Sequence, residues 1–112
     1  MSDAEGGPDL AEYALVILTG DFEGTRHVLR NDETIIGRNP TTDITLLDEG
    51  ISREHAIVSR DETTGSYAVE DLQSTNGTKV NGKRIRNAPL NLSDEIEVGH
   101  TKFKFILNED PE

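Results

Sequence analysis

The sequence predicts an all-β domain, and two observations lead to this fold class. First, no stripe of apolar residues at the 3.6-residue spacing of an amphipathic helix runs through residues 12–107. Second, short apolar or alternating runs recur along the chain, and Gly, Pro, Asn and Asp stand where the runs end. Short strands separated by a turn every 8–12 residues are typical of a β-sandwich or barrel.

The expected strands follow one another without an intervening helix. In chain order they are Tyr13–Leu18, Thr25–Leu29, Glu33–Gly37, Asp43–Leu46, His55–Arg60, Ser66–Asp71, Thr78–Val80, Arg84–Arg86, Glu95–Val98 and Thr101–Leu107. The last run alternates so that Phe103 and Phe105 face a core while Lys102 and Lys104 face water. Residues 61–65 are expected to form a hairpin loop. Asn81-Gly82 predicts a type I′ turn, and we expect no proline inside a strand.

Composition limits the classes of function. The 112 residues fit one domain and carry a net charge of -11, so nucleic acid and anionic membranes are not expected partners. Without cysteine the chain has no disulfide and no thiolate metal site. The acidic N-terminus differs from a signal peptide and no run is long enough to span a membrane, which predicts a cytoplasmic monomer without cofactors. We divide the chain into a flexible acidic leader (1–11), a domain (12–107) and an acidic tail or linker start (108–112).

Candidate binding residues gather in two polar connections, 37–54 and 71–79. Arg38 ends an expected strand, and its planar guanidinium can donate to two oxygens of a phosphate. Ser52 adds a hydroxyl and Arg53 a second cation, while Asn76 can both donate to and accept from a peptide backbone. Seven of the eleven basic residues lie between Arg38 and Arg86, so an anion site is possible on this acidic chain. These residue types predict a receptor for an oxyanion.

The order and spacing of these residues resemble the forkhead-associated (FHA) domain family. The resemblance is carried by Gly37-Arg38, Ser52-x-x-His55 and Asn76-Gly77, within the stretches ISREHA and DLQSTNGTKVNG, and it spans residues 13–107. It implies an FHA-type (SMAD/FHA-like) β-sandwich of about eleven strands whose apical loops bind phosphothreonine peptides.

The resemblance also implies roles for single residues. Arg38, Ser52 and Arg53 would bind the phosphate, Thr75 and Asn76 would meet the peptide backbone and the threonine methyl group, and Gly37, His55 and Gly77 would support the site. From its place beside the serine loop, His55 is expected to form hydrogen bonds that brace Ser52. The family often selects the third residue after phosphothreonine with the loop before the serine. Here that loop, 48–51, has no cation, so an apolar or basic residue is expected there.

The expected function is therefore recruitment of a partner phosphorylated on threonine, such as the substrate of a Ser/Thr kinase. Two alternatives stay open: a phosphate-independent interaction or dimerisation domain, and the sensory module of a larger kinase, cyclase or transcription regulator. Residues 1–12 contain no threonine, so a self-binding segment is not expected there. Thr63 and Thr64 lie in a short hairpin, which disfavours them as an intramolecular ligand.

The sequence carries little support for catalysis or for metal binding. Ser52, His55 and Asp71 are the residue types of a hydrolase triad, but the chain has no Gly-x-Ser-x-Gly elbow. The acidic pairs at 48–49 and 61–62 do not have the spacing of a calcium loop, and no histidine cluster accompanies them. We therefore expect neither a catalytic residue nor a metal site.

Overall fold

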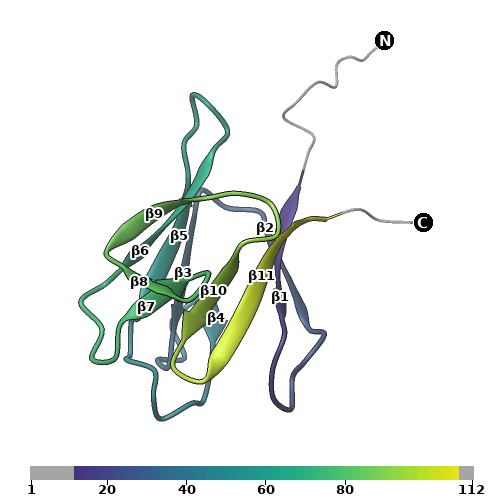
Figure 1. The fold of residues 1–112 in the computed structure, drawn as a ribbon. Coiled ribbons are helices and arrows are strands. Elements are labelled where there is room, and N and C mark those ends of the chain that lie inside the picture. The colour runs from purple at the N-terminus through teal and green to yellow at the C-terminus, as the bar shows by residue number, and fades with distance from the viewer. Residues whose placement is uncertain (1–11, 109–112) are drawn as a thin grey trace.

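The computed structural model describes residues 12–108, which form a β-sandwich of eleven strands (Figure 1). The strands are β1 (Tyr13–Ile17), β2 (Arg26–Leu29), β3 (Glu33–Gly37), β4 (Ile44–Thr45), β5 (Ala56–Arg60), β6 (Tyr67–Asp71), β7 (Thr78–Val80), β8 (Lys83–Ile85), β9 (Asn87–Leu90), β10 (Glu95–Val98) and β11 (Thr101–Leu107). Over this range the chain has no helix of the length and apolarity needed to cross a membrane. The leader (1–11) and most of the tail (109–112) lie outside the described residues.

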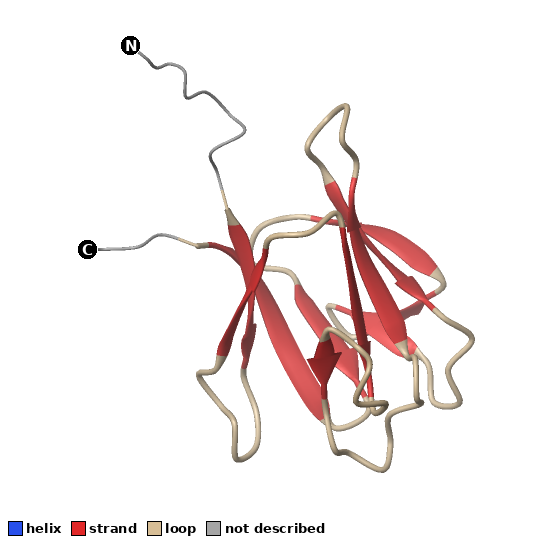
Figure 2. Cartoon of the chain, turned by 180° about the vertical axis from the view of Figure 1, so that it is seen from behind, coloured by secondary structure: helices blue, strands red, loops and turns tan. Residues whose placement is uncertain are grey.

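Two sheets make up the sandwich (Figure 2). The six-stranded sheet has the order β2-β1-β11-β10-β7-β8, and the five-stranded sheet has the order β4-β3-β5-β6-β9. All pairs are antiparallel except β3 and β4, where Ile36 lies opposite Ile44 in a parallel arrangement. The fold class predicted from alternation and turn spacing is confirmed.

The core lies between the sheets and is built from alternating inward residues. In β11, Phe103 and Phe105 are buried, as the alternation predicted, while Lys102 is exposed and Lys104 is partly exposed. Phe105 stacks on Tyr13 with ring centroids 5.2 Å apart and packs against Tyr67 at 5.3 Å. These rings join the two sheets, because Tyr67 comes from β6 of the five-stranded sheet.

The expectation that no strand contains a proline was wrong. Strand β9 was missed, and it carries Pro89 opposite Ala68 of β6. Because β9 is the outermost strand of its sheet, the missing N–H of proline removes no bond to a further strand. The other ten strands were predicted, and β8 begins and ends one residue earlier than expected.

The hairpin between β7 and β8 has the predicted turn. Asn81 and Gly82 have φ angles of 53° and 85°, both in the left-handed region that a type I′ turn requires. The turn sets the register in which Lys79 of β7 lies opposite Arg84 of β8.

Candidate functional site

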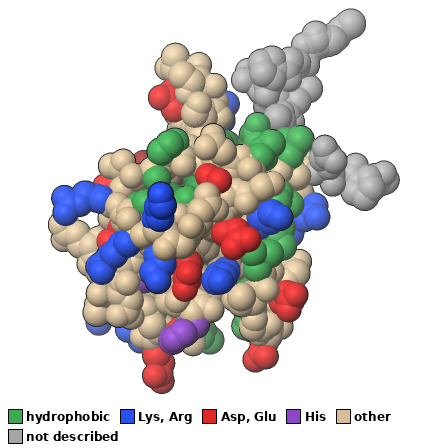
Figure 3. Space-filling model, viewed as in Figure 1, with side chains coloured by type: hydrophobic (Ala, Val, Ile, Leu, Met, Phe, Trp, Pro, Cys, Tyr) green, Lys and Arg blue, Asp and Glu red, His purple; other side chains and the backbone are tan. Residues whose placement is uncertain are grey.

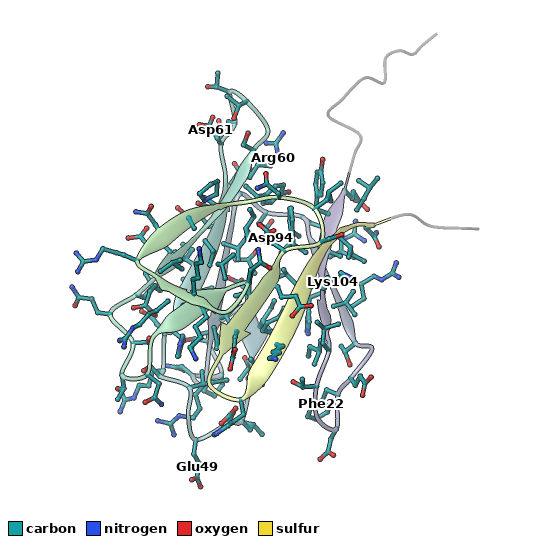
Figure 4. All side chains as sticks on the ribbon, in the orientation of Figure 1. Phe22, Glu49, Arg60, Asp61, Asp94 and Lys104 are labelled. Atoms are coloured by element: carbon teal, nitrogen blue, oxygen red, sulfur yellow. The ribbon has the colours of Figure 1, made fainter. Side chains whose placement is uncertain are left out.

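The predicted binding residues lie in three loops at one end of the sandwich: β3–β4, β4–β5 and β6–β7 (Figure 1). Figure 4 shows Glu49 of the β4–β5 loop at this end and Asp61 of the β5–β6 loop at the opposite end. We call the first the loop end and the second the far end. Residues separated by more than twenty positions in the sequence thus become neighbours on a rigid sheet framework.

Gly37 allows the β3–β4 and β4–β5 loops to touch. A Cβ atom at this position would lie 1.9 Å from the carbonyl oxygen of Arg53, so only glycine permits the contact. The Arg38 N–H then donates to Ser52 O at 3.0 Å, and the Asn39 N–H donates to Arg53 O at 3.2 Å. These backbone bonds place Arg38 beside Ser52 and Arg53.

The side chain of Arg38 is exposed, and one hydrogen bond fixes its orientation. Its Nε–H donates to the carbonyl of Ile51 at 3.1 Å, which leaves four of its five N–H groups for a ligand. Neither Arg38 nor Arg53 has an acidic ion-pair partner within residues 12–108. The two guanidinium groups, with Asn39 and Pro40, line a surface hollow. Two unneutralised cations facing one hollow are suited to an oxyanion.

Ser52 links the β4–β5 loop to the β6–β7 loop. Its Oγ accepts a hydrogen bond from the Thr75 N–H at 3.0 Å. A hydroxyl has one proton to donate as well as lone pairs to accept, so Ser52 remains able to donate to a ligand. Thr75 is exposed beside it.

His55 is fully buried beneath these loops. The Ser52 N–H donates to its Nδ1 at 3.1 Å, so that nitrogen carries no proton, and Nε2–H donates to Gly77 O at 2.8 Å. One imidazole therefore connects the β4–β5 loop to the β6–β7 loop. The expected contact with Ser52 is present, and the second contact, to Gly77, comes from a residue 22 positions away.

The other polar residue expected to meet a peptide, Asn76, is exposed and donates from Nδ2 to Gly50 O at 2.9 Å. It lines a second hollow with Gly50, Lys79, Glu97 and His100. Residues 48–51 of the β4–β5 loop include no cation, yet the fold brings two basic side chains, Lys79 and His100, and one carboxylate, Glu97, beside them. The sequence of the loop could not indicate this mixed lining.

Sequence reasoning missed a network that supports the third loop. Asp71 accepts hydrogen bonds from Ser74 Oγ at 2.5 Å and from Thr78 Oγ1 at 2.7 Å, and the Gly77 N–H donates to Ser74 Oγ at 2.8 Å. Partial burial acts to raise the pKa of the Asp71 carboxyl, but the hydrogen bonds from Ser74 and Thr78 outweigh it, and the pKa lies below its usual value. The Asp-x-x-Ser pattern that begins the loop is the signal that could have revealed it.

The same bonds show that Ser52, His55 and Asp71 do not form a catalytic triad. Ser52 meets the imidazole through its backbone N–H and not through its hydroxyl, and Asp71 bonds to Ser74 and Thr78. One aspartate of each acidic pair stabilises a turn. Asp48 accepts hydrogen bonds from the N–H groups of Gly50 and His100, and Asp61 accepts hydrogen bonds from N–H groups of its own hairpin. Within residues 12–108 no group of three His, Cys, Asp or Glu could hold a metal ion.

Comparison with known proteins agrees with this architecture. The sequence model of the FHA domain matches residues 34–99, which include the three loops. The chain is 36% identical over 110 residues to the oxoglutarate dehydrogenase inhibitor of Corynebacterium diphtheriae, covering 98% of this chain and 74% of that protein. It is 35% identical to the glycogen accumulation regulator GarA of Mycolicibacterium smegmatis, covering 95% of this chain and 65% of that protein. The chain belongs to the FHA domain family.

Solved structures give the same result. A structure from a study of phosphothreonine-dependent FHA domain interactions has a TM-score of 0.78 and 31% identity, covering 88% of this chain and 98% of that chain. Mycobacterium tuberculosis EmbR, in complex with a low-affinity phosphopeptide, has a TM-score of 0.80 and 31% identity, covering 91% of this chain and 26% of that chain.

Proposed function

We propose that this chain is a non-catalytic regulatory module that binds phosphothreonine in a partner protein. The observation that carries the proposal is the convergence of Arg38, Ser52 and Arg53 on one end of the sandwich, with two guanidinium groups free of carboxylate partners in the described chain. A phosphate ester brings about -1.5 to -2 charges and three acceptor oxygens, which these donors match.

In this proposal each residue has a separate task. The free N–H groups of Arg38 and the cation of Arg53 bind the phosphate oxygens, and Ser52 donates its hydroxyl proton while it accepts from Thr75. Asn76, at the rim of the next hollow, hydrogen bonds to the peptide backbone. The buried His55 keeps the β4–β5 and β6–β7 loops in place through its two hydrogen bonds.

Support also comes from relatives. One is named as an inhibitor of oxoglutarate dehydrogenase and another as a regulator of glycogen accumulation, and both names describe regulation and not catalysis. A structural neighbour was studied for phosphothreonine-dependent interactions. We infer that the partner is a substrate of a Ser/Thr kinase, and that the chain influences this partner by docking.

The test is calorimetric titration with a threonine peptide library in three forms: phosphothreonine, phosphoserine and unphosphorylated. Each charge-assisted hydrogen bond contributes about 1.5–3 kcal/mol, so the phosphothreonine form should bind at least about 100-fold more tightly than its unphosphorylated form. Phosphoserine should fall between them, because it lacks the methyl group.

Equal affinity for phosphorylated and unphosphorylated peptides would contradict the proposal and favour a phosphate-independent interaction domain. A preference for phosphoserine over phosphothreonine would contradict the assignment of a threonine methyl pocket near Thr75 and Asn76 while leaving phosphate binding in place.

A further inference from the structure

A cluster of cations on the β7–β8 hairpin is not explained by the proposed function. It comprises Lys79 of β7, Lys83 and Arg84 of β8, and Arg86, which directly follows β8; all four are exposed, and we call the cluster the hairpin patch. Figure 3 shows Lys and Arg side chains gathered over this region of the molecule. A concentration of positive charge is unexpected on a protein with 22 acidic and 11 basic residues.

The hairpin patch does not stabilise the fold through ion pairs. None of its four side chains forms a salt bridge or hydrogen bond with another residue in the part of the chain that the structure describes. In the strand register Lys79 lies opposite Glu97 of β10 on one side and opposite Arg84 of β8 on the other, and the like charges of Lys79 and Arg84 repel each other. An anionic ligand would remove this repulsion.

The hairpin patch is also continuous with the loop end. Arg84 lies over Gly77, where a Cβ atom would come within 2.5 Å of its Nε. Arg84 and Arg86 line a hollow whose other wall includes Ser74 of the β6–β7 loop. Two carboxylates also line this hollow: that of Asp71 is already occupied by hydrogen bonds from its own loop, and that of Glu70 is exposed. A peptide that reaches past the β6–β7 loop would therefore meet Arg84 and Arg86 together with one exposed carboxylate, Glu70, so the charge that it meets is positive on balance.

We propose that the hairpin patch binds acidic side chains of the same phosphorylated partner, on one flank of the phosphothreonine. This inference rests on the proposed function, since it requires a phosphopeptide held at the loop end. Exposed charge pairs contribute about 0.2–1 kcal/mol each and are screened by salt. The acidic flank therefore adds selectivity among phosphorylated partners and does not replace phosphate recognition.

The experiment uses phosphothreonine peptides with a neutral flank, with glutamates before the phosphothreonine, or with glutamates after it. They are titrated against the wild type, the hairpin variant Lys83→Gln/Arg84→Gln/Arg86→Gln, and the control variant Arg26→Gln/Arg30→Gln/Lys104→Gln. The control removes the same charge from other strands and loops. The readout is the ratio of affinities for acidic and neutral peptides in each protein.

In the wild type and the control variant, one acidic peptide should bind about 5- to 30-fold more tightly than the neutral peptide at low salt. In the hairpin variant this ratio should fall below about twofold, and in the wild type it should shrink between about 50 mM and about 300 mM salt. Arg86→Gln alone, which leaves Arg84 over Gly77, should reduce the ratio by about half on a logarithmic scale.

Two outcomes would overturn the inference alone: a wild type that binds the neutral phosphopeptide but gains nothing from either acidic flank, or a gain that the hairpin variant retains. If the neutral peptide binds equally with and without its phosphate, the proposed function fails and the inference fails with it.

Discussion

The two ends of the sandwich both carry arginines, but they use them in opposite ways. At the far end Arg30 pairs with Glu12 at 2.9 Å and Arg60 with Asp32 at 3.7 Å, around a hollow that also contains Glu62. At the loop end Arg38 donates only to a backbone carbonyl in the described chain, and Arg53 has no carboxylate within 4 Å there.

The difference supports the loop end as the proposed site for a phosphate. Carboxylates crowd the far end, where the pKa of Glu62 is raised mainly by a hydrogen bond with Asp32 and by the repulsion between them. A phosphate would meet that negative charge, whereas at the loop end it would meet unneutralised guanidinium groups. On an acidic protein, cations become available to a ligand only where the fold keeps carboxylates away from them.

The largest expected effect is a difference in stability between two glycine variants, one at the loop end and one at the far end. Gly37→Ala should lower the free energy of unfolding by about 4 kcal/mol, because its Cβ would overlap the Arg53 carbonyl. Gly65→Ala at the far end has space for a Cβ and a φ of 77°, so it should cost only about 1–2 kcal/mol of conformational strain. Urea unfolding of both variants gives the comparison. Similar losses at the two positions would show that the loops do not depend on the contact at Gly37.

The next largest effect is a difference in phosphopeptide affinity between a variant of a loop-end arginine and a variant of a far-end arginine. Arg38→Ala should weaken phosphopeptide affinity by at least about 3 kcal/mol, which is more than about 100-fold, since two charge-assisted bonds are lost. Arg30→Ala removes the same charge at the far end and should change affinity less than about twofold. Calorimetry with one phosphothreonine peptide measures both. Equal losses would mean that net charge, and not the position of Arg38, determines binding.

A smaller effect concerns the carboxylate that supports the third loop. Asp71→Asn should lower stability by about 1–2 kcal/mol at neutral pH, because bonds from Ser74 and Thr78 to a charged acceptor become weaker. The pKa of Asp71 is depressed, so its contribution is complete above the ordinary value of 3.8 and disappears as pH falls through the lower folded value.

The measurement is thermal unfolding of the wild type and of Asp71→Asn from neutral pH to pH values below 3.8. The two stabilities should converge as pH falls below about 4. A constant difference at every pH would contradict the role assigned to the charged carboxylate.

The smallest effect is expected from the far-end ion pair. Arg30 and Glu12 are largely exposed, at 67% and 43%, and such pairs contribute little in water. Glu12→Gln should therefore change the free energy of unfolding by less than about 0.5 kcal/mol and leave phosphopeptide binding unchanged. Urea unfolding and calorimetry check both, and a loss of affinity would show that the two ends are coupled.

Much of the fold could be predicted from the sequence, because alternation and turn residues act locally. Ten strands, the Asn81-Gly82 turn and the inward Phe103 and Phe105 follow from neighbouring residues alone. Strand β9 was missed because Pro89 is unfavourable in most strands, and only the sheet order shows that this strand lies at an edge.

For the candidate site, the sequence by itself determined the residue types and their order: an arginine after a glycine, a serine three residues before a histidine, and an Asn-Gly pair. The tertiary structure decided their neighbours. It placed the Arg53 backbone on Gly37, the Thr75 N–H on Ser52, and the Gly50 carbonyl on the Asn76 side chain. These contacts span up to 26 residues of sequence, and they form only because two packed sheets hold the loops at one end. Local patterns cannot specify such distances, because they depend on the packing of the whole domain.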